Sequence, residues 1–292
     1  MPPRKPSPVG AHVPTGSGLV RGALAYAKRV NAQAMQIFVG NPRGWSLSAG
    51  DPVQDAEFRA ACDAERMPVF LHAPYLINLG SPTPTTVERS VASLEHALGR
   101  AADLGALGVV LHSGSAVDSS HRETAMRQVR ELLLPLLDAL EAKGPAGLRL
   151  LIEPTAGGGE ALAATVDDLS SYFEVLDGHP RLGVCLDTCH AYAAGHDLAR
   201  PGGVRRTLNA LVKGVGKGRL GLVHANDSKD PLNSGRDRHA PIGVGTIGVD
   251  PFAELFVHPA MRGVPVVVET PGGERQHGID VRALQRLRDS AR

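Results

Sequence analysis

Eight short apolar runs alternate with helix-like segments along the chain, and this alternation limits the possible fold more than any other feature. The runs occupy residues 8–13, 35–39, 69–71, 108–111, 149–152, 182–186, 220–223 and 264–268. Within each run apolar residues follow one another without polar alternation, which indicates parallel strands that are buried on both faces. Eight such strand–helix units predict an α/β protein with a closed (β/α)8 TIM barrel.

The segments between the runs have helical periodicity. We expect helices at residues 18–30, 53–65, 85–104, 122–142, 166–176, 204–212, 251–257 and 279–288. Pro135 should kink or split the fourth of these helices, because proline cannot donate the backbone hydrogen bond. Residues 226–248 are expected to form a long polar loop. Residues 1–8 are basic and rich in proline, so we expect a disordered tail before a single domain at residues 9–292.

Composition limits the class of protein. A net charge of +1 gives no global sign of nucleic-acid binding, so any such surface must be local. Three cysteines are too few for a disulfide framework, and we interpret Cys185 and Cys189 as small packing residues. No apolar run approaches the roughly 20 residues that span a bilayer. We therefore expect a cytoplasmic protein without a membrane segment.

Six of the eight runs are followed directly by a residue whose side chain commonly binds metals. These residues are His72, His112, Glu153, Asp187, His224 and Glu269. The carboxyl ends of barrel strands share one rim, so the six side chains should converge at one mouth. His190 follows Asp187 closely, and Asp237 and His239 lie in the long polar loop. Asp187 alone could cap a helix, and any single histidine could be an ordinary core residue, but their joint placement favours a metal site.

Nine candidate ligands are too many for one metal. A tetrahedral zinc uses at most four, so the set indicates two or three ions. Imidazole and carboxylate without thiolate favour zinc or manganese over magnesium or calcium. Three dications would exceed the charge of four carboxylates and attract a phosphodiester. Paired metals about 3.5–4 Å apart typically activate a hydroxide, so the pattern predicts phosphoester hydrolysis.

Several motifs resemble endonuclease IV, the zinc-dependent apurinic/apyrimidinic endonuclease family. They are Gly10-Ala11-His12 and the segments at residues 72–79, 183–198, 224–229, 236–239 and 269–271, and the resemblance extends over residues 9–287. It implies three zinc ions in the mouth of a (β/α)8 barrel. The first would be held by His72, His112 and Glu153. Glu153 would bridge to a second, held by Asp187, His224 and Glu269, and the third would be held by His190, Asp237 and His239.

The resemblance also implies an activity in DNA repair. The enzyme would hydrolyse the phosphodiester 5′ to an abasic site in duplex DNA with a metal-bridging hydroxide held at the catalytic carboxylates Glu153 and Glu269. The products would be a 3′-hydroxyl and a 5′-deoxyribose phosphate, and blocked 3′ ends would also be trimmed. A duplex must lie across the open mouth, so we expect a monomer that associates with the nucleoid when it is on DNA.

Five residues are candidates for DNA contact. Arg43, Tyr75 and Leu76 stand where the family places residues that enter the duplex when the abasic nucleotide is flipped out. Lys229 and Arg238 could meet backbone phosphates. The alternatives are a solvated loop for Arg43, a cover of the barrel rim for Tyr75 and Leu76, and plain exposed charge for the other two. Gly158 and Val244 depart from the usual family residues.

Two other functions remain open. A metal-dependent sugar-phosphate isomerase or epimerase uses the same barrel, but it needs only one or two metals, so His190, Asp237 and His239 argue against it. A catalytically inactive protein that binds damaged DNA would have no need of nine ligands.

Overall fold

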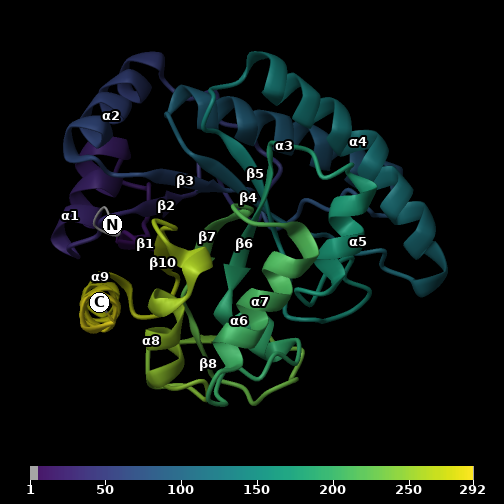
Figure 1. Ribbon diagram of the computed structural model, residues 1–292. Helices are drawn as coiled ribbons and strands as arrows, with labels where there is room; N and C mark the ends of the chain where they lie inside the picture. Colours follow the sequence, from purple (N-terminus) through teal and green to yellow (C-terminus); the bar gives the residue numbers. More distant parts are fainter. Residues whose placement is uncertain (1–5, 292) are drawn as a thin grey trace.

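The eight predicted runs form a closed barrel of parallel strands in the computed structural model, which describes residues 6–291. Figure 1 shows the strands at the centre with the helices around them. Neighbours around the barrel follow the order β1-β2-β3-β4-β5-β6-β7-β10, and β10 pairs with β1. The strands are β1 Val9–His12, β2 Met35–Ile37, β3 Val69–His72, β4 Gly108–His112, β5 Arg149–Glu153, β6 Leu182–Asp187, β7 Leu220–His224 and β10 Val266–Val268. The TIM barrel prediction is confirmed.

A helix lies in each of the eight segments where one was expected. They are α1 Ala25–Arg29, α2 Pro52–Glu65, α3 Pro84–Asp103, α4 Arg122–Lys143, α5 Asp168–Val175, α7 Gly203–Val215, α8 Asp250–Val257 and α9 Gly273–Ser290. A π-helix, η1 Leu19–Leu24, precedes α1, and η2 Ser119–His121 and η3 Pro259–Met261 are short 3-10 turns. Helix α4 continues through Pro135, so the split that proline allowed does not occur. The short helix α6, Thr188–Ala193, was not predicted.

The segment expected as a long polar loop contains a small strand pair. Strand β8, Asp227–Ser228, pairs antiparallel with β9, His239–Ala240. The buried Asp227 carboxylate accepts hydrogen bonds from the backbone N–H groups of Gly243, Gly245 and Ile247. These contacts fix the loop, because an unpaired buried carboxylate would be costly.

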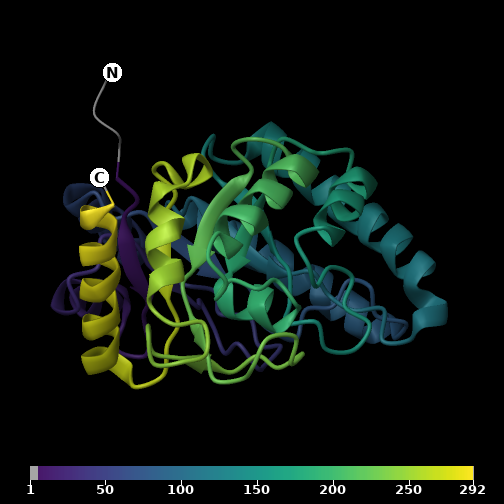
Figure 2. The ribbon, with the colours of Figure 1, turned by 60° about the horizontal axis from the view of Figure 1, so that its bottom comes forward.

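The packed part of the chain begins before the expected boundary at residue 8. Ser7 is buried and its hydroxyl donates to the carbonyl of Met261 at 2.5 Å. The N–H of Val266 donates to the carbonyl of Pro8. Residues 1–5, the rest of the expected tail, lie outside the described residues. Figure 2 shows α9, the last helix, alongside the first strand.

Seven buried residues form a separate apolar cluster that we call the inner layer: Ala34, Phe70, Val110, Leu151, Cys185, Leu222 and Val267. Their immediate neighbours along the strands belong to the larger cluster that packs against the helices. Because side chains alternate between the two faces of a strand, the inner layer points into the barrel. Among residues 6–291, no helix is both long and apolar enough to cross a membrane.

Candidate metal centre

The six strand-end ligands lie two residues after members of the inner layer, so they also point into the barrel. The first group is His72, His112 and Glu153, whose ligand atoms lie within 4.8 Å of one another. The Nε2 atoms of His72 and His112 are each 3.3 Å from Glu153 Oε2. The three residues come from the adjacent strands β3, β4 and β5, which explains their proximity.

Glu153 connects this group with a second one. Asp187, His224 and Glu269 also place ligand atoms within 4.8 Å of one another. The second oxygen of Glu153, Oε1, lies 2.9 Å from His224 Nδ1, and Glu269 Oε2 lies 3.2 Å from the same nitrogen. The two oxygens of Glu153 therefore face different groups, which is the arrangement that a bridging carboxylate requires.

The third group includes residues of the long loop at residues 226–248. Asp187, His190 and His239 place ligand atoms within 4.8 Å of one another. Asp237 lies between the two imidazoles, with Oδ2 at 3.2 Å from His190 Nε2 and Oδ1 at 3.0 Å from His239 Nε2. The pairing of β8 with β9 positions His239, because His239 is the first residue of β9. All nine predicted ligands thus converge in one mouth.

Asp187 serves as a helix cap and as a member of the cluster. Its Oδ1 accepts from the backbone N–H of His190 at 2.9 Å and caps α6. Its Oδ2 accepts from Asn226 Nδ2 at 2.7 Å and lies 3.6 Å from His239 Nε2. Asp187 therefore caps a helix through Oδ1 and is a candidate metal ligand through Oδ2, so both interpretations of this residue apply.

The cluster has unusual electrostatics. Burial raises the pKa of Glu153, but His224 and then His112 outweigh it and hold this pKa well below its usual range. Burial lowers the pKa of His190, but Asp187 and then Asp237 raise it to about 10. Without metal, the His190 imidazole would therefore be held as a cation by the carboxylates of Asp187 and Asp237.

Within the described part of the chain, two buried atoms of the cluster, Glu153 Oε2 and His239 Nε2, have polar neighbours at 3.3 and 3.0 Å but form no hydrogen bond of good geometry. An unsatisfied buried polar atom typically costs about 1–3 kcal/mol. Cations at the centre of the groups would satisfy both atoms, and imidazole nitrogens with carboxylate oxygens are common zinc ligands. The residues therefore fit a site for more than one metal ion.

Two residues outside the nine predicted ligands, Gln36 and His12, hold this cluster in place. Gln36 of β2 is fully buried, and its Nε2 donates to Glu269 Oε1 at 2.7 Å. Its Oε1 lies 2.9 Å from His224 Nε2, so that nitrogen must be the donor and Nδ1 is left facing the cluster. His12 Nδ1 lies 3.0 Å from the same oxygen of Glu269. The sequence shows only a glutamine within an apolar run, which does not by itself identify these partners.

The two cysteines near Asp187 are buried, as expected of packing residues. Cys185 belongs to the inner layer and approaches Glu153 and His224 closely enough to form a three-residue group. Burial raises the pKa of the Cys185 thiol to about 12, which disfavours the thiolate that binds metals.

Tyr75, one of the predicted DNA-contacting residues, lies beside the metal centre. Tyr75 is 44% exposed and packs against the rings of His72 and His112, with centroids 5.2 and 5.6 Å away. Its backbone N–H donates to the carbonyl of Pro42, which holds the loop of the exposed Arg43 beside it. A cavity of about 390 Å³ opens here, lined by Tyr75, Gly158, His112, His190 and Asp237 among others.

The remaining candidates differ in their surroundings. Leu76 is half-buried beside Tyr75, and the Lys229 side chain is exposed. Arg238 forms two hydrogen bonds with the Asp230 carboxylate, at 2.6 and 2.5 Å, so its guanidinium is already paired. Val244 is 74% exposed.

The chain is similar to known proteins over nearly its whole length. Residues 24–289 match the family model described as a xylose isomerase-like TIM barrel. A probable endonuclease 4 from Streptomyces avermitilis is 56% identical over 283 residues, which cover 97% of this chain and 91% of that protein. The crystal structure of endonuclease IV from Thermus thermophilus aligns with a TM-score of 0.83 at 34% identity, over 99% of this chain and 100% of that one. A D-tagatose 3-epimerase-like protein aligns with a TM-score of 0.73 at 18% identity over 97% of this chain and 98% of that one, a likeness of fold alone.

Proposed function

We propose that this chain, which belongs to the endonuclease IV family and is a phosphodiesterase, cleaves duplex DNA on the 5′ side of abasic sites. The products would be a 3′-hydroxyl and a 5′-deoxyribose phosphate, and blocked 3′ ends would be trimmed in the same mouth. The observation that carries the proposal is the convergence of nine imidazole and carboxylate groups around Glu153, whose oxygens face different groups.

The residues that would hold the metals follow from the three groups. His72, His112 and Glu153 would hold one zinc ion, Asp187, His224 and Glu269 a second with Glu153 between them, and His190, Asp237 and His239 a third. Manganese could replace zinc at one or more positions, because both accept this mixture of ligands. When bound, such ions supply an activated water and positive charge near the departing oxygen.

The protein's own contribution would be to set the spacing of the cluster. Glu153 is fully buried and cannot swing away, and Glu269 is held by Gln36 and His12. We infer that these two carboxylates fix the place where the phosphodiester reacts.

The side chains around the mouth would position the damaged strand. The cavity beside Tyr75 would receive the flipped abasic sugar, while Arg43 and Leu76 would occupy the gap left in the duplex. Lys229 would meet a backbone phosphate, and Arg238 would contribute less because it is paired with Asp230. One chain carries the whole set of ligands, so we propose that a monomer is sufficient.

A labelled duplex with a single abasic site tests the proposal. Incision that stops after chelation and returns with zinc supports the phosphodiesterase, and elemental analysis gives the metals per chain. Turnover of a sugar phosphate without incision would instead support an isomerase. Retention of the damaged duplex without incision would support an inactive binding protein.

A further inference from the structure

A second cavity lies at the opposite end of the barrel from the metal centre. It has a volume of about 1160 Å³ and is lined by residues at or next to strand beginnings, including Pro8, Val69, Arg149, Leu220 and Pro265. We call it the basal cavity. Known ligand pockets typically have volumes of roughly 300–1,000 Å³, so this space can receive an organic molecule of ordinary size.

The inner layer separates the basal cavity from the metal centre. Phe70 and Leu151 belong to that layer and also line the cavity. The ligands His72 and Glu153 lie two residues further along the same strands. A molecule in the basal cavity would therefore touch none of the proposed metal ligands, which identifies it as a distinct site.

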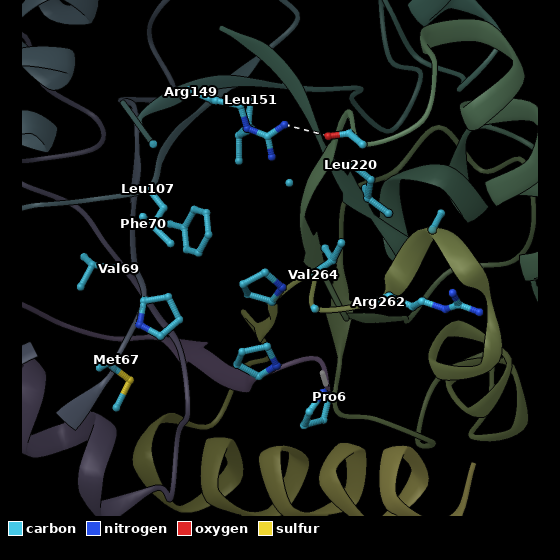
Figure 3. Close-up of a pocket in the computed structure, with 18 of the residues that line it drawn as sticks. Pro6, Met67, Val69, Phe70, Leu107, Arg149, Leu151, Leu220, Arg262 and Val264 are labelled. Carbon is cyan, nitrogen blue, oxygen red and sulfur yellow. Dashed lines mark hydrogen bonds between the residues drawn. The ribbon is translucent and has the colours of Figure 1, made fainter. Parts of the chain in front are cut away.

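The wall of the cavity is apolar. Figure 3 shows Phe70, Leu151 and Leu220 around a common space, with Leu107 nearby. Leu107 is 43% exposed although it is a large apolar residue. Glycines occupy inward positions in this part of the barrel: Gly108 and Gly183 lie two residues before Val110 and Cys185 of the inner layer. The strands β4 and β6 therefore add no side chain at this level, and Leu151 packs over both glycines: an ideal Cβ would lie 2.9 Å from Leu151 at Gly108 and 2.7 Å from it at Gly183.

The charged groups of the cavity are nearly all cationic. Five basic residues and one acid line it: Arg59, Arg66, Arg149, Lys217, Arg262 and Asp63. Within residues 6–291, none of the five cations forms a salt bridge with a carboxylate. The cavity therefore has an excess of unpaired positive charge.

Arg149 is the most informative of these cations. Its Nη1 donates to the carbonyl of Gly218 at 2.9 Å, the contact drawn in Figure 3. Burial and the neighbouring Arg219 lower the pKa of Arg149. A partly buried guanidinium beside a second cation lacks the counter-charge that usually compensates for lost hydration.

We propose that the basal cavity binds an amphipathic organic anion, a small molecule with an apolar body and one carboxylate or phosphate group. The apolar body lies against Phe70, Leu151 and Leu220, and the anionic group meets Arg149. Its occupancy does not require the metal centre.

Anilinonaphthalene sulfonate, a fluorescent aromatic anion, is a suitable probe for the purified full chain. We expect saturable binding of one probe per chain, unchanged by a chelator and not displaced by a duplex with an abasic site. Dodecanoate and dodecyl phosphate should displace the probe, whereas dodecanol should displace it much less. The more effective of the two anions identifies the head group that the site prefers.

Variants distinguish a specific binding site from nonspecific binding of the probe. Arg149→Met should weaken probe binding by about tenfold or more, because a charge-assisted contact is lost. If this variant does not fold, a double variant at two exposed cations, Arg59→Glu with Lys217→Glu, should weaken probe binding by about fivefold or more. The matched control reverses two exposed cations of α9, Arg282→Glu with Arg286→Glu, and should bind as the parent does. Circular dichroism shows whether each variant is folded.

The opposite results would overturn the proposal. They are a probe affinity that is equal in the cavity variants and the α9 control, displacement by dodecanol as strong as by dodecanoate, or displacement by the abasic duplex. The last result would place the probe at the metal centre. None of these readouts depends on incision. The proposal can therefore fail while the nuclease function is confirmed, and the nuclease function can fail while the basal cavity binds the probe.

Discussion

Replacing Gln36 by methionine tests how the barrel interior holds the metal centre. Methionine has a similar length and no branching, so it fills the same buried space without either hydrogen bond. The change removes the donor to Glu269 Oε1 at 2.7 Å and the acceptor that faces His224 Nε2 at 2.9 Å. Both partners are proposed metal ligands, and both would lose the contact that sets their orientation.

The magnitude follows from these two contacts. A hydrogen bond to a charged group contributes about 1.5–3 kcal/mol and a neutral one about 0.5–1.5 kcal/mol, so together they represent about 2–4.5 kcal/mol. Loss of such a partner behind a metal ligand typically costs about 10–100-fold in metal affinity or activity. We expect Gln36→Met to lower kcat/KM for an abasic duplex by that factor and to reduce the zinc bound per chain.

Gln285 offers a matched control. It is also buried, and its side chain donates to the Asn31 carbonyl at 2.9 Å and accepts from Asn31 Nδ2 at 3.0 Å. Gln285→Met should lower the free energy of unfolding to a similar extent but leave kcat/KM and zinc content unchanged. The reasoning is refuted if Gln36→Met retains the parent's activity and zinc, or if both variants lose activity equally.

Four further predictions follow from other contacts. Chelation should abolish incision and lower the melting temperature. When free zinc is about 1,000-fold above its dissociation constant, zinc binding adds about 4 kcal/mol to the free energy of unfolding. Calorimetry with and without chelator measures this difference. Glu153→Gln should reduce incision by more than about 100-fold, beyond the usual effect of an outer partner, and near-parental turnover would contradict its bridging role. Arg43→Ala should weaken binding to an abasic duplex and reduce the salt dependence by about one counterion, which a salt titration of the dissociation constant would show. Asp55→Asn should lower the free energy of unfolding in urea by about 3–5 kcal/mol, because it breaks the buried ion pair in which Arg100 Nη2 lies 2.7 Å from Asp55 Oδ1. Incision by the folded variant should stay unchanged.

The sequence was sufficient for the barrel and for the convergence of the ligands. Side chains alternate strictly along a strand, so a polar residue after a buried run must lie on the rim, and His72, His112 and Glu153 followed from that rule alone. Neighbouring strands then brought these side chains together without any further information.

Other features depended on contacts that leave no local trace in the sequence. The pairing of β8 with β9 involves two residues on each side, which is too short for a periodic signal. Gln36 looks like any polar residue in a three-residue strand until its partners His224 and Glu269 are in place. Ser7 packs against Met261, more than two hundred residues away, so a local reading of the tail could not find its contact.

The order of the ligands along the chain has a consequence for biosynthesis. His72, His112 and Glu153 lie on three adjacent strands that are complete by the middle of the chain, whereas Glu269 follows the strand that closes the ring against β1. The set that contains Glu269 cannot assemble until the last strand has been synthesised, so the complete cluster forms only when translation is nearly finished.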